Sequence, residues 1–200
     1  MLYFLSFLSD GGDVFNLFRY ITFRAGGAFF TALIIFFTFG RYSINFLKKL
    51  QKEGQPIRKD GPQEHIIKKA GTPTMGGVII MLAVTVSTIL WARLDNQYVW
   101  IILFVTFSFG VIGLIDDYIK VTKQSYGGLS GRLRLMFGFL IAIIAVYFIQ
   151  VQHLDDLNRS LALPIFKDHL VFMGALFFPF AMIVIVGSAN AVNLTDGLDG

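Results

Sequence analysis

The amino-acid sequence predicts an all-α polytopic membrane protein with about five transmembrane helices. Hydrophobic residues make up 55% of the 200 residues, and the mean hydropathy is +0.66. The chain also holds 22 phenylalanines, which a soluble domain of this size could not bury without leaving large apolar patches. Several apolar runs reach the roughly 20 residues that a helix needs to cross the hydrocarbon core.

Five runs qualify as spanning helices: residues 25–47, 70–92, 96–115, 135–152 and 170–195. Arg41 interrupts the first run, and its long side chain can reach the interface. Residues 71–74 read better as a loop entering the second helix. The fifth run is longer than one crossing requires, and Pro179 is a candidate kink within it. The apolar residues 1–9 are too short to span, so we expect them to lie at the membrane interface.

Basic residues predict the orientation of the chain. Residues 48–73 contain seven lysines and arginines and residues 120–134 contain four, whereas the intervening connections hold few. The positive-inside rule therefore places these two loops in the cytoplasm and the N-terminus outside, within a single transmembrane domain formed by residues 1–200. The net charge of +4 comes from loop residues, which favours lipid headgroups and anionic substrates over nucleic acid.

Two adjacent acids, Asp116 and Asp117, close the third predicted span. Carboxylates are costly near a membrane, and acids at a helix C-terminus oppose the macrodipole, so a cation should offset them. One alternative is a simple ion pair from Asp116 to Lys120, four residues later. Neighbouring helical residues point about 100° apart, so we expect one carboxylate near a metal and the other facing a reacting group. Oxygen ligands alone favour Mg²⁺.

A second group of polar residues ends the fifth predicted span. Asn190, Asn193, Asp196 and Asp199 recur at intervals of three, so neighbouring members share one face of a helix. Glycines at 197 and 200 predict that the helix breaks there. The alternative is a plain exit turn rich in asparagine, aspartate and glycine.

Two basic segments are candidate anion sites. Lys68 and Lys69 precede a glycine-rich entry to the second helix that includes Thr74, where backbone N–H groups attract phosphate. Lys123 begins a glycine-rich basic loop after the acidic pair. Both segments are equally compatible with ordinary cytoplasmic loops that set topology. Together, the acids, the lysines and the interface suggest chemistry on a lipid-linked phosphate with a phosphorylated cytosolic partner.

Four motifs follow one another along the chain in the order found in one family of enzymes. Gly54-Gln55-Pro56-Ile57-Arg58, Gly71-Thr72-Pro73-Thr74-Met75-Gly76-Gly77, Gly113-Leu114-Ile115-Asp116-Asp117-Tyr118 and the segment from Asn190 to Gly200 resemble the phospho-N-acetylmuramoyl-pentapeptide transferases over essentially the whole chain. This resemblance implies transfer of phospho-MurNAc-pentapeptide from UDP-MurNAc-pentapeptide to undecaprenyl phosphate, giving lipid I and UMP in peptidoglycan synthesis. It also implies the first half of a ten-helix bundle, Mg²⁺ as cofactor, a homodimer when full length, and the bacterial cytoplasmic membrane with a cytoplasmic active site.

The resemblance also implies residue roles. Asp116 matches a candidate base that deprotonates or orients the lipid phosphate, and Asp117 matches its partner near the metal. Lys69 matches a lysine on the uridine side, and Thr74 and Lys123 fall in segments expected to bind substrate. The residues on the nucleotide and metal side are Asn190, Asn193, Asp196 and Asp199, with Asp117 and Asp199 as the expected metal ligands.

The family pattern continues through about five more helices, including a further metal-binding aspartate and a histidine-rich loop. We therefore expect this chain to be an N-terminal part that is inactive alone. Two alternatives stay open: a sister transferase that uses another UDP-hexosamine, and an ion-coupled transporter with Asp116 and Asp117 as its ion site.

Overall fold

The computed structural model describes residues 1–51, 73–124, 127–152, 159–163 and 169–197. Most of these residues are helical, and the chain forms two compact units, residues 1–129 and 130–200. Within the described ranges, four helices are long and apolar enough to cross a membrane, and a fifth apolar helix is shorter. The chain is therefore an all-α polytopic membrane protein, as the sequence predicts. The single domain expected for the whole chain stays a prediction.

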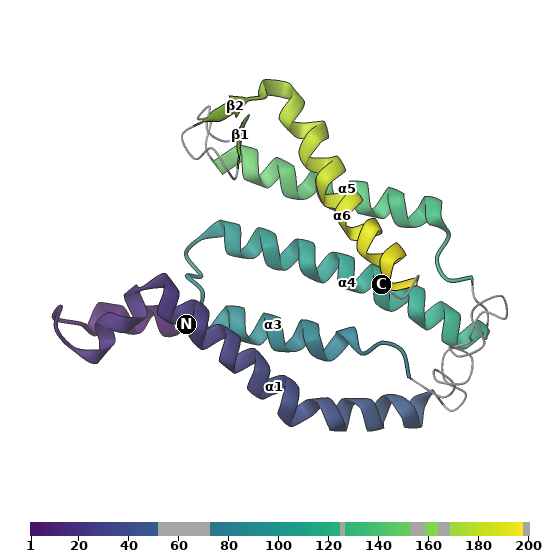
Figure 1. Cartoon of the computed structure of the whole chain (residues 1–200), viewed down its shortest axis with the longest axis horizontal. Coiled ribbons are helices and arrows are strands. Elements are labelled where there is room, and N and C mark those ends of the chain that lie inside the picture. Colours follow the sequence, from purple (N-terminus) through teal and green to yellow (C-terminus); the bar gives the residue numbers. More distant parts are fainter. Residues whose placement is uncertain (52–72, 125–126, 153–158, 164–168, 198–200) are drawn as a thin grey trace. The chain divides into compact units, whose positions relative to one another are not determined.

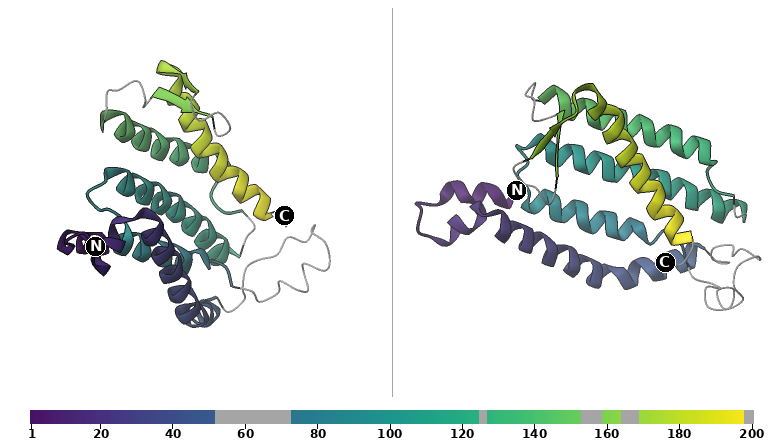
Figure 2. Two further views of the ribbon diagram at one scale, coloured as in Figure 1. Left: turned by 60° about the vertical axis from the view of Figure 1, so that its left-hand side comes forward. Right: turned by 45° about the horizontal axis from the view of Figure 1, so that its top comes forward.

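The first unit is built on three helices. They are α1 (Ile21–Leu50), α3 (Gly77–Trp91) and α4 (Gln97–Lys123), and α3 lies between the other two. Figure 2 shows the same arrangement from two further directions. Asn96 begins α4, since its side chain accepts a hydrogen bond from the Tyr98 N–H at 3.0 Å.

The second predicted span is shorter in the structure than in the sequence analysis. Helix α3 has 15 residues, a rise of about 22 Å at the usual 1.5 Å per residue. The backbone of Met75 has φ +68°, in the left-handed region, and Pro73 disfavours helical geometry in the residue before it. Residues 73–76 therefore enter the helix as a loop, which confirms the loop predicted at residues 73 and 74; residues 71 and 72 lie outside the described residues.

Close contacts between helices in this unit depend on glycine. A side chain at Gly27 would overlap the Trp91 ring, and one at Gly110 would overlap the Met81 thioether. Because glycine has no side chain, α1 and α4 can approach α3 closely at these two positions. Small residues serve the same purpose in other transmembrane helix contacts, where lipid offers no hydrophobic driving force.

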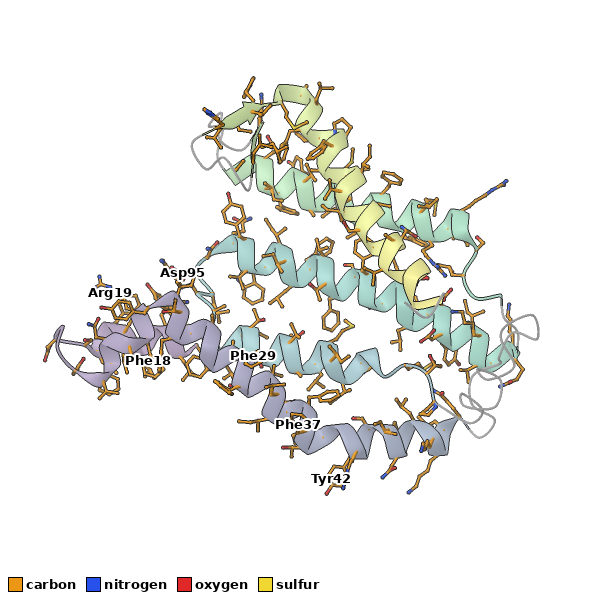
Figure 3. All side chains as sticks on the ribbon, viewed as in Figure 1. Phe18, Arg19, Phe29, Phe37, Tyr42 and Asp95 are labelled. Carbon is orange, nitrogen blue, oxygen red and sulfur yellow. The ribbon has the colours of Figure 1, made fainter. Side chains whose placement is uncertain are left out.

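Aromatic and basic residues gather at one end of the first unit. Two short 3₁₀ helices, η1 (Leu2–Leu8) and η2 (Val14–Arg19), precede α1. The Tyr3 ring lies between the guanidinium groups of Arg24 and Arg93, at 4.9 and 4.8 Å. Figure 3 labels Phe18, Arg19 and Asp95 at this same end. Clusters of this kind are common at membrane interfaces. The interfacial location of residues 1–9 stays a prediction.

The turn between α3 and α4 carries an ion pair. Arg93 donates to Asp95 at 2.7 Å, and this hydrogen bond holds the pKa of the Asp95 carboxyl below its usual range. Both side chains are exposed, so the pair shapes the turn without contributing much stability.

The second unit contains α5 (Gly131–Gln152) and α6 (Phe177–Gly197). A two-stranded antiparallel sheet joins them, with β1 (Ser160–Ala162) paired to β2 (Leu170–Phe172), followed by η4 (Gly174–Leu176). The buried core is small and close-packed: Ile141, Ala142, Ala145 and Val146 on α5, with Val186 on α6. Figure 1 shows α6 crossing α5 beyond the sheet.

The predicted start of the fifth span is wrong. Residues 170–172 form a strand, and the helix begins only at Phe177. Gly174 adopts φ +55° and interrupts helical geometry before that point. Pro179 therefore lies in the first turn of α6, where a missing N–H costs nothing, and is not a kink within the span.

Candidate functional site

Helix α4 carries the acidic pair, but it does not end there. The sequence analysis places Asp116 and Asp117 at the end of the third span, whereas α4 continues to Lys123. Gln124 then ends the helix in the left-handed conformation, with φ 45°. The pair therefore lies before the last turn, where the helix macrodipole acts only weakly, and the predicted conflict with that dipole is wrong.

Asp116 is buried, with 2% of its surface exposed. Its Oδ1 accepts the Leu129 N–H at 2.7 Å, and its Oδ2 lies 2.6 Å from Lys120 Nζ. A side chain at Gly128 would overlap Asp116 Oδ1 and approach Lys120 Cε to 2.9 Å. The loop after α4 therefore folds back onto this carboxylate. Lys120 supplies a cation for this carboxylate through the i,i+4 ion pair that the sequence left open as the alternative to a metal site.

Asp117 has different surroundings. Its side chain is 28% exposed, and its Oδ2 accepts the Thr74 hydroxyl at 2.6 Å. Its other oxygen lies 3.7 Å from Lys120 Nζ. Adjacent residues of a helix face directions about 100° apart, and the two carboxylates accordingly contact different groups. Asp117 is the more accessible of the two.

Thr74 reaches Asp117 because its backbone is held by Gln51, a residue that the sequence analysis missed. Gln51 directly follows α1 and is only 7% exposed. Its amide donates to the Thr74 carbonyl at 3.2 Å and accepts the Thr74 N–H at 2.9 Å. No sequence motif includes Gln51, and its role becomes visible only from its hydrogen bonds with Thr74 in the structure.

The asparagine residues lie in the second unit. Asn190 donates to the Val186 carbonyl of its own helix at 2.8 Å, and Asn193 accepts a hydrogen bond from Arg134 of α5 at 3.0 Å. Asn190 also lines a shallow, mostly apolar groove with Leu135, Phe139, Ile183, Val186 and Gly187. Both asparagines therefore lie on α6, and the Arg134 guanidinium lies beside Asn193.

The remaining predicted residues are described only in part. Lys123 is exposed in the last turn of α4. Asp196 lies in the last turn of α6, and its side chain is outside the described part of the structure. Lys69 and Asp199 lie outside the described residues altogether. The roles assigned to all of these residues stay predictions.

The acidic pair fits a hard cation by its donor chemistry. Mg²⁺ binds oxygen ligands, and proteins commonly hold it through one or two carboxylates together with water and substrate phosphates. Asp117 offers such an oxygen, with the Thr74 hydroxyl and the Asp116 carboxylate close by. Within the residues described, no group of three acidic, histidine or cysteine side chains is arranged to hold a metal alone.

Comparison with known proteins gives two matches to family models. Residues 99–200 match the model of glycosyl transferase family 4, which covers half of the chain and includes α4 with its acidic pair. Residues 69–81 match signature 1 of phospho-N-acetylmuramoyl-pentapeptide-transferase, which includes Thr74. The Thr74–Asp117 hydrogen bond thus joins the two matched regions.

Similar proteins named phospho-N-acetylmuramoyl-pentapeptide-transferase occur in several bacteria. The chain is 64% identical to that of Dinoroseobacter shibae and 61% identical to that of Ruegeria pomeroyi, each over all 200 residues. It is 53% identical to that of Maricaulis maris. The chain covers 55–56% of these relatives, so it spans about half of their length. From its helical membrane fold, its acidic pair and these matches, the chain belongs to glycosyl transferase family 4.

Proposed function

We propose that the protein carrying this chain transfers phospho-MurNAc-pentapeptide from UDP-MurNAc-pentapeptide to undecaprenyl phosphate, giving lipid I and UMP. The observation that carries the proposal is the Thr74–Asp117 hydrogen bond, because it joins the transferase signature to the acidic pair of family 4. The names of the relatives support the same reaction.

In the proposed reaction, an oxygen of the lipid phosphate attacks the sugar-bearing phosphorus of the UDP-sugar. A new P–O bond forms as the bond to UMP breaks, and UMP leaves with the bonding electron pair. Mg²⁺, when bound, would neutralise charge on the diphosphate and help UMP leave. The proposed Mg²⁺ ligands are Asp117, within the described residues, and Asp199, which lies outside them.

The chain's own residues would orient the phosphates and manage charge. Thr74 fixes Oδ2 of Asp117, while Oδ1 lies 3.7 Å from Lys120 Nζ and the side chain is 28% exposed. Asp116 is the proposed base, but its oxygens are engaged by Leu129 and Lys120. Proton uptake by Asp116 therefore requires Lys120 to turn toward the arriving lipid phosphate, which is also anionic. Positioning of this kind accounts for much of the acceleration in phosphoryl transfer.

On the nucleotide side, the proposed contacts come from Lys69, Lys123, Asn190, Asn193 and Asp196. The proposed site faces the cytoplasm at the bacterial inner membrane, as the basic loops favour. The full-length protein is proposed to be a homodimer.

The experiment is UMP release by a full-length version in membranes or detergent, with both substrates and Mg²⁺. Release that requires the lipid phosphate and Mg²⁺ supports the proposal, and Asp116→Asn and Asp117→Asn should each abolish most of it. UMP release with a different UDP-hexosamine, but none with UDP-MurNAc-pentapeptide, would indicate the sister transferase instead. An unchanged rate in Asp116→Asn would contradict the base assignment.

A further inference from the structure

The C-terminal end of α1 is linked to the transferase signature by one buried glutamine. Gln51 follows the last helical residue, Leu50, and its own N–H still bonds to the Leu47 carbonyl at 2.9 Å. Its side chain is 7% exposed, which is unusual for glutamine and requires that its polar atoms be paired.

Both halves of the Gln51 amide bind the same residue. The carbonyl oxygen accepts the Thr74 N–H at 2.9 Å, and the amide nitrogen donates to the Thr74 carbonyl at 3.2 Å. A primary amide carries both an acceptor and donors, so one glutamine side chain can pair the N–H and the carbonyl of a single residue. Gln51 therefore fixes the Thr74 backbone through both of its polar groups.

The next residue shows that this backbone needs support. Met75 adopts φ +68°, a conformation that costs a residue with a β-carbon about 1–2 kcal/mol. Unfavourable backbone conformations persist when surrounding contacts hold them in place, and they concentrate at functional sites. The Gln51 amide is such a contact, one residue before the unfavourable φ angle.

Beyond the backbone, the same residue makes the contact to the acidic pair. The Thr74 hydroxyl donates to Asp117 Oδ2 at 2.6 Å, a short hydrogen bond to a charged acceptor. Gln51, Thr74 and Asp117 thus form a continuous series of hydrogen bonds from the end of α1 to α4.

We infer that Gln51 is a positioning residue for the proposed transfer reaction. It acts through Thr74 to hold the Asp117 carboxylate in one orientation. This inference rests on the proposed function for its kinetic consequence, while the contact itself is independent of the reaction. Gln51 itself is not among the residues expected to bind the UDP-sugar, so its loss should lower kcat by a larger factor than it raises KM for that substrate.

The first test is a double-mutant cycle in the full-length protein. Gln51→Leu and Thr74→Val should each lower kcat by about 10- to 100-fold, the scale of a 1 Å displacement of a reacting group. If Gln51 acts through the Thr74 hydroxyl, Gln51→Leu should have little further effect on the Thr74→Val enzyme. Thr74→Ser keeps the hydroxyl and should recover most of kcat. If Gln51→Leu lowers kcat by the same factor in the Thr74→Val enzyme as in the wild type, the inference is overturned.

Ser87→Ala is the matched control. Its hydroxyl is also buried in the first unit, but it donates only to the Ala83 carbonyl of its own helix at 2.7 Å. This variant should keep normal kcat and KM. Should Gln51→Leu fail to accumulate in membranes, Gln51→Glu replaces it in the cycle, because it keeps the acceptor for the Thr74 N–H and puts a carboxylate oxygen in place of the donor that faces the Thr74 carbonyl.

A second measurement separates the contact from the activity. Residues 1–200 contain no cysteine, so in a full-length protein with any later cysteine replaced by serine, Thr74→Cys introduces a single thiol at a residue whose backbone can still bind Gln51. Alkylation of this thiol by a small water-soluble reagent should be at least about tenfold faster with Gln51→Leu, because the segment opens more often. Equal rates would overturn the inference even in an active enzyme. A full-length protein that releases no UMP would instead contradict the proposed function.

Discussion

At the residue scale, two adjacent carboxylates have unlike surroundings. Asp116 is buried against a backbone N–H and a lysine, whereas the Asp117 side chain is partly exposed. The difference comes from the helix, which points neighbours in different directions, and from the loop that folds back over Asp116. Changes at the groups around Asp116 should therefore affect stability first.

Gly128 allows the loop to approach Asp116, so Gly128→Ala should be destabilising. The added methyl group would overlap Asp116 Oδ1 and displace the Leu129 N–H, whose hydrogen bond to a charged group contributes about 1.5–3 kcal/mol. A lower midpoint in chemical or thermal unfolding in detergent would show it. Gly113→Ala, on the same helix and with open space around it, is the control and should be as stable or more stable.

Lys120 neutralises a buried acid, so Lys120→Met should destabilise the protein by at least about 1–3 kcal/mol. The reason is that Asp116 would stay buried without its cation. Adding Asp116→Asn to this variant should restore part of the loss, because the amide carries no charge. Unfolding free energies of both variants, beside exposed Lys123→Met, test this. Equal stability of the single and double variants would contradict the explanation.

At the element scale, helix ends determine where the site residues lie. Helix α4 continues beyond the acidic pair and ends at Gln124, in a left-handed conformation that glycine adopts most readily. Helix α3 begins late, after the left-handed Met75. The loops at these two ends contain the groups that contact Asp116 and Asp117.

Gln124→Gly should raise the free energy of unfolding by about 1 kcal/mol, because it removes the steric cost of a β-carbon at φ 45°. Thr122→Gly, inside the last turn of the same helix, should instead lower it by about 0.5–1 kcal/mol. Parallel unfolding curves in one detergent measure both changes. Stabilisation by both substitutions, or by neither, would contradict this account of the helix end.

At the scale of the whole molecule, the helices set which groups share a side of the bilayer. Residues 95 and 123 flank opposite ends of α4, a 27-residue helix that is about 40 Å long. Residues 1–200 contain no cysteine, so Asp95→Cys and Lys123→Cys are each introduced into a full-length protein in which any cysteine beyond residue 200 is replaced by serine. An impermeant thiol reagent outside intact cells should modify position 95 and spare position 123. Labelling of both from the same side would contradict the predicted topology.

Much of this molecule could be predicted from the sequence. Apolar runs locate the helices because a bilayer demands about 20 apolar residues, and the spacing of Asp116 and Lys120 predicts their pair. The end of α4 and the strand at residues 170–172 could not be predicted, because both depend on local backbone geometry. The contacts of Gln51 and of the Leu129 N–H could not be predicted for a related reason. Gln51 binds the backbone of Thr74, and Leu129 binds Asp116 through its own backbone N–H. Backbone groups are the same in every residue, so such contacts leave no pattern in the sequence.

The contact between Met81 and Gly110 makes the spacing of α3 and α4 sensitive to oxidation. The thioether fills the space that a side chain at Gly110 would occupy, so there is little room for an added oxygen. Conversion of Met81 to its sulfoxide would add both volume and a dipole at a tight apolar contact. Peroxide stress would thereby loosen the helix that carries the acidic pair, and a sulfoxide reductase would restore the contact.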